Sequence, residues 1–200
     1  MKKFYIEVEL LSPLQLGSGK ADIILDSEAA HDKYGLPVFP GKRFKGLLYE
    51  SALEMAEISG EAWFTKAEVD ALFGRGEDDQ PALRVDNLTL PGYEGLQEQW
   101  RELQRLYPGV FSSEELWQTY TDIRCQTAID AESGTTVDGS LHNLRVVDAG
   151  IKFEGCLQLL RDMPKAEDII AKALLNLRYA GAKRNRGCGR ILCKLLEGRR

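Results

Sequence analysis

A short loop near the end of the chain combines glycines with basic side chains. Residues 181–190 read GAKRNRGCGR, and residues 178–200 hold eight Lys or Arg against a single acidic residue. Glycine permits positive φ and a close approach of the backbone to a ligand. Successive N–H groups in such a turn can bind an anion, and arginine donates two hydrogen bonds to a phosphate. The pattern predicts a phosphate-chain site formed by Lys183, Arg184, Arg186, Gly187 and Gly189. The alternative is a helix that ends at Gly181, followed by a solvated basic hairpin.

A second group of glycines and basic residues lies in the first quarter of the chain. Gly17 and Gly19 begin a long loop, and a predicted helix begins at Pro40-Gly41. Phosphate is favoured at a helix N-terminus by free N–H groups and by the helix dipole. Basic side chains in the first turn add charge, and Gly46 would allow a close backbone approach. The alternative is an ordinary solvated helix face. The candidate phosphate-binding residues in this segment are Gly17, Gly19, Lys42, Arg43 and Lys45.

Length and composition set the limits of the fold. With 200 residues, of which 44% are hydrophobic, the chain can bury one substantial core. No apolar run reaches the roughly 20 residues of a membrane span, and residues 1–3 lead directly into an alternating strand rather than a secretory signal. We therefore expect a cytoplasmic protein with no membrane partner.

Charge is unevenly distributed along the chain. The formal net charge is −5, and residues 54–138 hold eighteen Asp or Glu against six Lys or Arg. This asymmetry favours a narrow basic groove on an acidic body over a surface that coats nucleic acid generally. Four cysteines without a C-x-x-C pair, and two histidines far from them, disfavour a zinc site.

Hydrophobic periodicity predicts the elements that position these loops. Alternation predicts strands at residues 3–11, 82–90, 151–160 and 189–196. Apolar stripes at helical spacing predict helices at residues 40–60 and 164–177. Between the second and third strands we expect a helical insert at residues 91–120 and a thumb-like arm at residues 120–147.

The order of these elements predicts the fold class. It is the β-α-β-β-α-β order of the ferredoxin-like arrangement, which RNA-recognition modules share. We therefore expect an α+β fold in a single domain of residues 1–200. The predicted central strands lack the aromatic pairs on which RNA-recognition sheets stack bases. The loops are therefore the favoured RNA site.

Five segments in order resemble the RAMP superfamily (repeat-associated mysterious proteins) of CRISPR systems. They are SPLQLGSG at residues 12–19, DKYGLPVFPGKRFKG at 32–46, LFG with LRVDN at 72–74 and 83–87, LRVVDAGIKFE at 144–154, and the loop at 181–190. The third and fourth are similar to stretches of the backbone subunits of type III effector complexes. The resemblance covers most of the chain and leaves residues 91–120 unmatched.

This resemblance implies partners and a reaction. It implies binding to a guide RNA and to a complementary target RNA, together with other effector subunits and copies of the chain stacked head-to-tail. In such subunits the acidic residue six positions before the motif aspartate, here Asp32, cuts the target RNA with a divalent metal such as Mg²⁺. That spacing implies Asp26 as the catalytic residue and metal ligand, with Asp22 as the alternative. Equally, Asp26 is a residue type that commonly caps a loop turn.

Other functions remain open at this level. His31 offers a metal-free acid–base mechanism like that of guide-processing ribonucleases, which have a similar glycine-rich loop. A catalytically silent architectural paralogue and a nucleotide-binding enzyme unrelated to RNA are two further alternatives. The arm holds apolar residues of the kind that unstack bases, and few of the cations common in the family. Its apolar candidates are Ile123, Ile129, Val137 and Leu141, and its remaining cations are Arg124 and Arg145.

Overall fold

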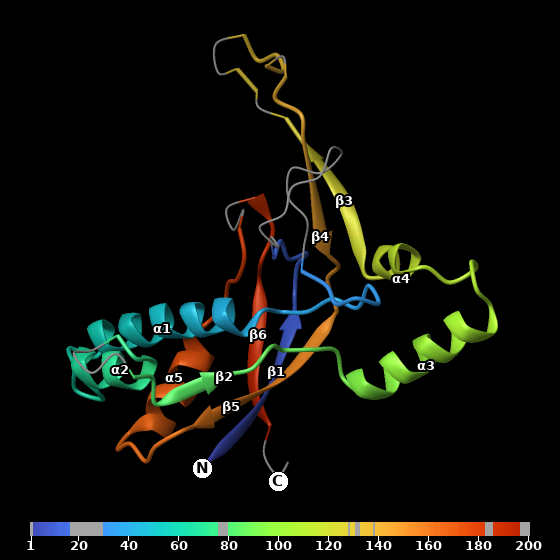
Figure 1. The fold of residues 1–200 in the computed structure, drawn as a ribbon. Coiled ribbons are helices and arrows are strands. Elements are labelled where there is room, and N and C mark those ends of the chain that lie inside the picture. The colour runs from blue at the N-terminus through green and yellow to red at the C-terminus, as the bar shows by residue number, and fades with distance from the viewer. Residues whose placement is uncertain are drawn as a thin grey trace.

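A four-stranded antiparallel sheet lies at the centre of the protein, which is seen in a computed structural model (Figure 1). The structure describes residues 2–16, 30–75, 80–127, 129–130, 133–137, 139–182 and 186–196. The sheet has the order β2-β5-β1-β6. These strands are β1 (Lys3–Leu10), β2 (Leu83–Val85), β5 (Lys152–Leu159) and β6 (Ile191–Leu196).

The alternating sequence of β1 separates the two faces of this sheet. Phe4, Ile6, Val8 and Leu10 are buried, whereas the residues between them are only partly covered. Val8 pairs with Phe153 of β5 and with Cys193 of β6, both also buried. Each fully buried large apolar side chain contributes about 1.5–3 kcal/mol, so this face fixes the register of the sheet.

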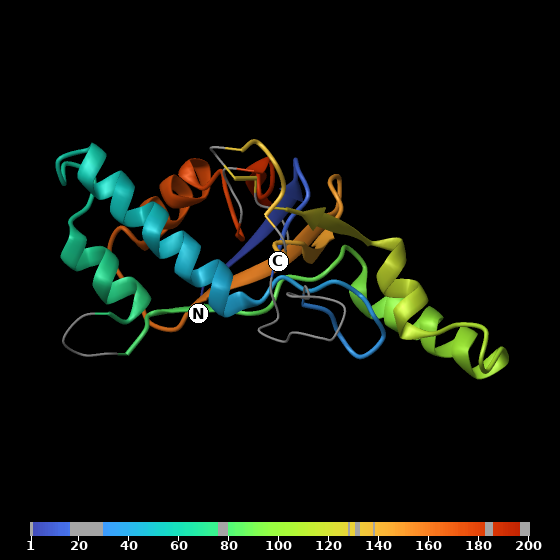
Figure 2. The ribbon, with the colours of Figure 1, turned by 90° about the horizontal axis from the view of Figure 1, so that it is seen from above.

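Helices α1 (Gly41–Ile58) and α5 (Ala166–Asn176) cover the apolar face. Figure 2 shows the two helices beside each other along the sheet. The Ser51 hydroxyl donates to the Ala173 carbonyl at 2.8 Å where they meet. Phe39, just before α1, packs edge-on against Phe44 and Phe153 and joins the helix to the sheet.

One helix was not predicted, and one strand is shorter than predicted. Helix α2 (Lys66–Phe73) begins with a reciprocal cap, in which the Glu68 N–H donates to Thr65 Oγ1 and the Thr65 N–H to the Glu68 carboxylate. This Thr-x-x-Glu pattern was its signal in the sequence. Strand β2 covers only three of the nine residues expected, because regular pairing with β5 is interrupted after Val85, where the Asn87 side chain caps α1, and resumes only as an isolated bridge between Thr89 and Glu154.

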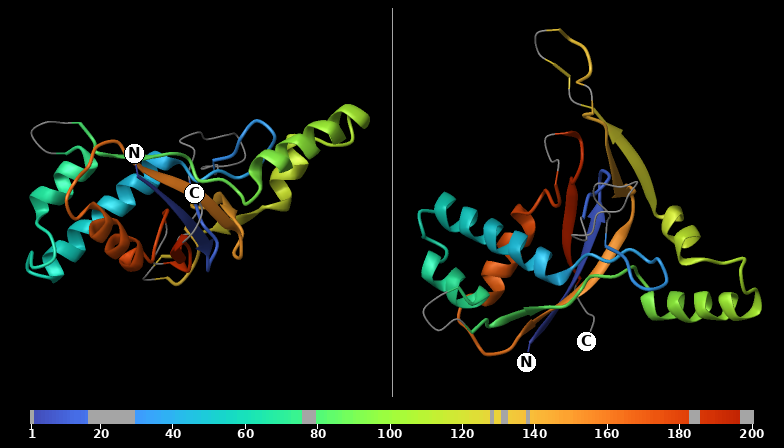
Figure 3. Two further views of the ribbon diagram at one scale, coloured as in Figure 1. Left: turned by 90° about the horizontal axis from the view of Figure 1, so that it is seen from below. Right: turned by 45° about the horizontal axis from the view of Figure 1, so that its top comes forward.

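The insert and the arm lie between β2 and β5. Helices α3 (Tyr93–Leu106) and α4 (Ser113–Thr119) form the insert, and β3 (Thr121–Gln126) pairs antiparallel with β4 (His142–Val147). Figure 1 shows this hairpin projecting beyond the sheet, and Figure 3 shows α3 at the end opposite α2.

Without the insert and the arm, the core runs β1-α1-β2-β5-α5-β6 with α2 after α1. This order, together with the antiparallel β2-β5-β1-β6 sheet, confirms the α+β fold and the expected βαββαβ core.

Candidate nucleic-acid interface

Residues 12–16 connect the glycine-rich loop to the arm. The Gly189 N–H donates to the Pro13 carbonyl at 2.8 Å, and the Ala182 N–H donates to the Gln15 carbonyl at 3.3 Å. Between them, Leu14 and Val147 of β4 exchange two backbone hydrogen bonds of 2.8 Å. Three regions that are distant in the sequence therefore meet at this short segment.

Two glycines of the loop are required by this junction. Gly181 has φ +72°, and a Cβ there would lie 2.3 Å from the Gln15 carbonyl oxygen. Gly189 has φ +83°, and a Cβ would lie 2.1 Å from the Ala180 oxygen. Gly187 has φ +75° but faces open space. The Gly189 N–H is already donated inside the protein, so in this conformation it is not a free donor for a phosphate.

The start of α1 is capped by the protein itself. The Asn87 side-chain oxygen accepts the Gly41 N–H at 2.9 Å, and a Cβ at Gly41 would lie 2.5 Å from the Asp86 oxygen. The free amides expected at this terminus are therefore partly used. Lys42 and Arg43 remain exposed, so side-chain charge is what this turn offers a phosphate.

Lys45 differs from these two residues because it is partly buried. Burial, and secondly the nearby Arg75 guanidinium, lower the pKa of Lys45. Arg75 lies over the Tyr49 ring at 4.3 Å, and the Tyr49 hydroxyl donates to Asp70 at 2.7 Å. Lys45 thus belongs to a small cationic and aromatic cluster between α1 and the end of α2.

A hollow of about 350 Å³ brings the two predicted basic segments together. Its walls are Arg43, Gly46, Leu47 and Glu50 of α1, with Leu16, Gly181 and Ala182 opposite. A Cβ at Gly46 would meet nothing within 4 Å, so this turn of the helix is open. The first turns of α1 and the glycine-rich loop therefore form one surface.

The arm contacts this surface at its base. Arg186 donates to the Gln126 side chain at 3.4 Å, and Arg124 approaches the Cys188 sulfur at 3.9 Å. Arg145 is instead only 6% exposed and bonds to Thr121 and Glu114, so it holds α4 against the arm. The four apolar candidates of the arm are all exposed, at 42–68%.

Asp32, the motif aspartate, organises a turn and anchors the insert. Its Oδ1 accepts the Tyr34 and Leu36 N–H groups at 2.8 and 2.9 Å. Its Oδ2 accepts the Tyr93 hydroxyl and the Gln97 side chain of α3, each at 2.9 Å. Burial, and then Asp32, raise the pKa of Tyr93 to about 12. Asp32 is therefore a positioning residue.

His31 lies at the edge of the same turn. Its ring is exposed, stands 4.8 Å from the Trp117 ring, and places Nδ1 2.7 Å from the Asp32 carbonyl oxygen. Gly17, Gly19, Asp22, Asp26, Lys183 and Arg184 lie outside the described residues. The described residues contain no group of three or more His, Cys, Asp or Glu placed to hold a metal ion.

The face of the sheet opposite α1 and α5 carries lysines that are paired with carboxylates. Lys152 lies 3.3 Å from Glu7 and 4.0 Å from Glu9, and Lys194 lies 3.8 and 3.7 Å from the same two carboxylates. On this face of β1, Tyr5 is the aromatic residue, and it lies between Lys3 and the two glutamates. Because these cations are already paired with carboxylates, this face offers little to a phosphate chain.

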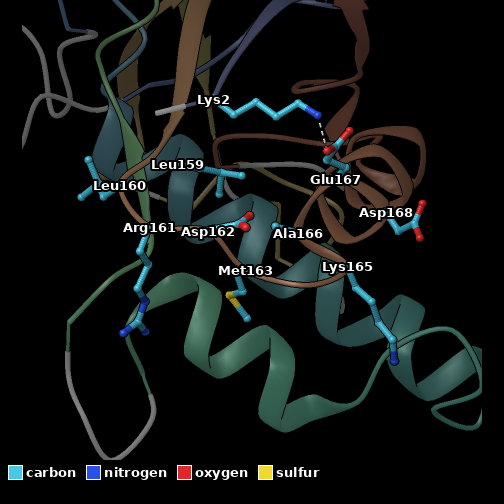
Figure 4. A pocket seen from close by; sticks show the side chains of 10 residues that line it. All are labelled: Lys2, Leu159, Leu160, Arg161, Asp162, Met163, Lys165, Ala166, Glu167 and Asp168. Atoms are coloured by element: carbon cyan, nitrogen blue, oxygen red, sulfur yellow. Dashed lines mark hydrogen bonds and ion pairs between the residues drawn. The ribbon is translucent and has the colours of Figure 1, made fainter.

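A larger hollow, of about 510 Å³, lies away from this interface (Figure 4). It is formed by the end of β5 and the start of α5, with Lys2 across from Glu167. Lys2 pairs with Glu167, Lys165 pairs with Glu68, and Arg161 donates to two backbone carbonyls. Because these cations already have partners within the protein, this hollow is a poor phosphate site despite its larger volume.

Within the described ranges, every helix is too short or too polar to cross a lipid bilayer.

Comparison with known proteins gives one family and one fold. The sequence pattern of the RAMP superfamily matches residues 7–192. No curated protein matches the chain in sequence. Two cryo-EM structures of type III-B Cmr-beta are similar, one bound to cognate target RNA and one in the apo state. Their TM-scores are both 0.70, at 11% and 12% identity, and each comparison covers 98% of this chain and 97% of the other. At this identity the likeness concerns the fold.

Proposed function

Because this chain belongs to the RAMP superfamily, we propose that it is the guide-RNA-binding backbone subunit of a type III CRISPR ribonucleoprotein. The observation that carries the proposal is the hollow in which Arg43 and Gly46 of α1 face Gly181 of the glycine-rich loop. The fold that it shares with Cmr-beta chains, one of them in a complex bound to target RNA, supports it further.

The chemistry of this interface suits the phosphate chain rather than the base sequence. Lys42 and Arg43 in the first turn of α1, and Arg186 in the glycine-rich loop, are exposed cations. Such contacts are sequence-tolerant and salt-sensitive. Base pairing between guide and target would then supply the sequence specificity. The exposed apolar residues of the arm are the candidates for separating base pairs at intervals.

The partners follow from the same proposal. Guide RNA longer than one subunit requires neighbouring subunits, and copies of the chain or paralogues would stack head-to-tail along it. Heterologous contacts of this kind extend helically when they do not close into a ring.

RNA recovery tests the binding half of the proposal. The chain would be co-expressed with a repeat-spacer array and its neighbouring subunits, purified gently, and the bound RNA sequenced. We expect guide-length RNA with the wild type and at least tenfold less with Arg43→Ala plus Arg186→Ala. Lys152→Ala plus Lys194→Ala, on the sheet face, is the matched control and should retain RNA. RNA-free wild-type complex would contradict the proposal.

Cleavage of target RNA is the second half of the proposal. Asp26 is the proposed catalytic residue and ligand of a divalent metal such as Mg²⁺, an assignment that comes from the sequence alone because Asp26 lies outside the described residues. We expect Asp26→Ala to abolish Mg²⁺-dependent cutting by the assembled complex while guide RNA stays bound. Undiminished cutting by this variant would remove Asp26 from the mechanism.

The same assay separates the alternatives. Loss of cutting in Asp22→Ala alone would transfer the role to Asp22. Cutting of repeat RNA in EDTA that depends on His31 would identify a processing ribonuclease. A complex that binds guide and target but never cuts would be architectural.

A further inference from the structure

The hollow beside Arg43 continues along α1 into a second one. The second hollow measures about 180 Å³ and lies between α1 and the segment that follows α5. Leu47 and Glu50 line both hollows. Together they form a groove, called here the α1–α5 groove, that leads from Arg43 past Glu50 to Tyr179. The first part alone is within the usual size of a small-ligand site, about 300–1,000 Å³.

The first part of the groove is open and largely apolar. Leu16 and Leu47 supply apolar walls, and the missing side chain at Gly46 leaves the α1 side open. Arg43 and Glu50 are seven residues apart on α1, which places them on the same helix face about 10 Å apart along the axis. A ring bound against this apolar lining would therefore have a cation toward one end and a carboxylate toward the other.

Glu50 is the unexpected member of this groove. A carboxylate repels phosphate, so Glu50 is not a partner for the phosphate groups of RNA. Its oxygens accept hydrogen bonds, and the described part of the chain supplies no hydrogen-bond or ion-pair partner for them. Glu54, one turn later, differs because its carboxylate accepts a 2.9 Å hydrogen bond from Asn176. Glu50 is thus available to accept N–H groups from a bound molecule.

The far end of the groove offers an aromatic surface. Tyr179 is 46% exposed and lies next to the exposed Arg178. It is held in place by a β-bridge to Arg190, at the end of the glycine-rich loop. Tyrosine rings and arginine planes are the usual stacking partners of unpaired RNA bases. Both parts of the groove therefore suit bases rather than phosphates.

We infer that the α1–α5 groove takes one unpaired nucleobase of the bound RNA, and that Glu50 reads the N–H donors on its edge. This inference rests on the proposed function and adds a base-specific contact to it. Guanine presents two adjacent N–H donors to a carboxylate, whereas adenine and cytosine present one amino group. Uracil presents one N–H flanked by two carbonyl oxygens, which repel the carboxylate. Guanine should therefore bind most tightly and uracil least.

Fluorescence anisotropy with short RNAs tests this inference. The probes are a labelled ten-nucleotide oligouridylate and the same RNA with one central guanosine, adenosine, cytidine or inosine. For the wild-type chain, or its complex if RNA binding requires it, we expect the single guanosine to tighten binding roughly tenfold, as good bidentate base contacts do. Inosine lacks the amino group and should lose most of this gain.

Two variants assign the preference to Glu50. Glu50→Gln should abolish most of the guanosine preference and bind oligouridylate slightly more tightly, because the neutral amide no longer repels the uracil carbonyl oxygens. Glu57→Gln makes the same charge change on an exposed part of α1 that lines neither hollow, and it should keep the preference.

The possible failures are distinguishable. If the wild type binds none of these RNAs, the proposed function and this inference both fall. Binding without base preference, or a preference that survives Glu50→Gln, would overturn the inference alone. The same probes made as 2′-deoxy oligonucleotides lack the ribose hydroxyl. If Glu50→Gln no longer changes binding to these probes, Glu50 contacts a ribose hydroxyl, and the base assignment is wrong.

Discussion

The open sheet face and the loop side of this protein both carry basic residues, but in different electrostatic states. On the sheet face, Lys152 and Lys194 each lie within 4.0 Å of Glu7 and Glu9. On the loop side, Arg43 lines a hollow and has no acidic partner within 4.0 Å among the described residues. Pairing, more than the number of cations, therefore distinguishes the sheet face from the loop side that is proposed to bind RNA.

The largest expected effect concerns the glycines that build the loop side. Gly189→Ala forces a Cβ to within 2.1 Å of the Ala180 oxygen at φ +83°, whereas Gly187→Ala has the same backbone strain in open space. We expect Gly187→Ala to lower the free energy of unfolding by about 1–2 kcal/mol and Gly189→Ala by clearly more. Denaturant unfolding measures both, and RNA binding should be lost only in Gly189→Ala. Equal effects would show that the close approach of Gly189 to the Ala180 oxygen does not contribute to stability.

The salt dependence of RNA binding distinguishes the two sides directly. Each phosphate contact removed from a single strand should reduce the slope of log K against log salt by about 0.7. We expect that reduction for Lys42→Ala and for Arg43→Ala, and no change for Lys194→Ala. Anisotropy titrations between low and physiological salt give the slopes. A reduced slope in Lys194→Ala would place RNA on the sheet face and reverse the comparison.

The smallest expected effect is a pH dependence that comes from Lys45. Burial, and then Arg75, lower the pKa of Lys45, so the unfolded chain holds this proton more tightly than the folded chain does. The Lys45 contribution to stability therefore rises with pH between the lowered pKa and the ordinary lysine value of about 10.4.

Lys45→Met tests this pH dependence by comparison with the wild type. The variant should be more stable at pH 7, and its advantage should shrink as the pH approaches 10. Unfolding free energies of both proteins across that range give the difference. Lys42→Met, in the exposed first turn, controls for the loss of a positive charge. An advantage of Lys45→Met that stays constant with pH would show that packing, not charge burial, is responsible.

The sequence alone was enough to predict the fold class and the turns of the last loop. Strand β1 was predictable because its apolar residues alternate with polar ones, and α5 was predictable because its apolar residues repeat at helical spacing. The glycines of the last loop were predictable as turn residues because their backbone requirement is local. Helix α2 was missed although Thr65 and Glu68 form its cap. Strand β2 was predicted too long because the sequence does not show that the Asn87 side chain caps α1.

Tertiary structure decided what these local features do together. The fold pairs β1 with β6, and it pairs residues 12–16 with both β4 and the last loop. This pairing places Gly189 against Pro13 and Leu14 against Val147. Only that assembly makes Gly189 structural, leaves Arg43 facing Gly181, and opens a groove around Glu50. Periodicity and turn chemistry act over a few neighbouring residues, whereas pairing of charges, capping by Asn87 and the shape of a hollow depend on residues far apart in the chain. The sequence therefore identified the residues proposed to bind RNA, and the fold decided which of their donors and charges are already used within the protein.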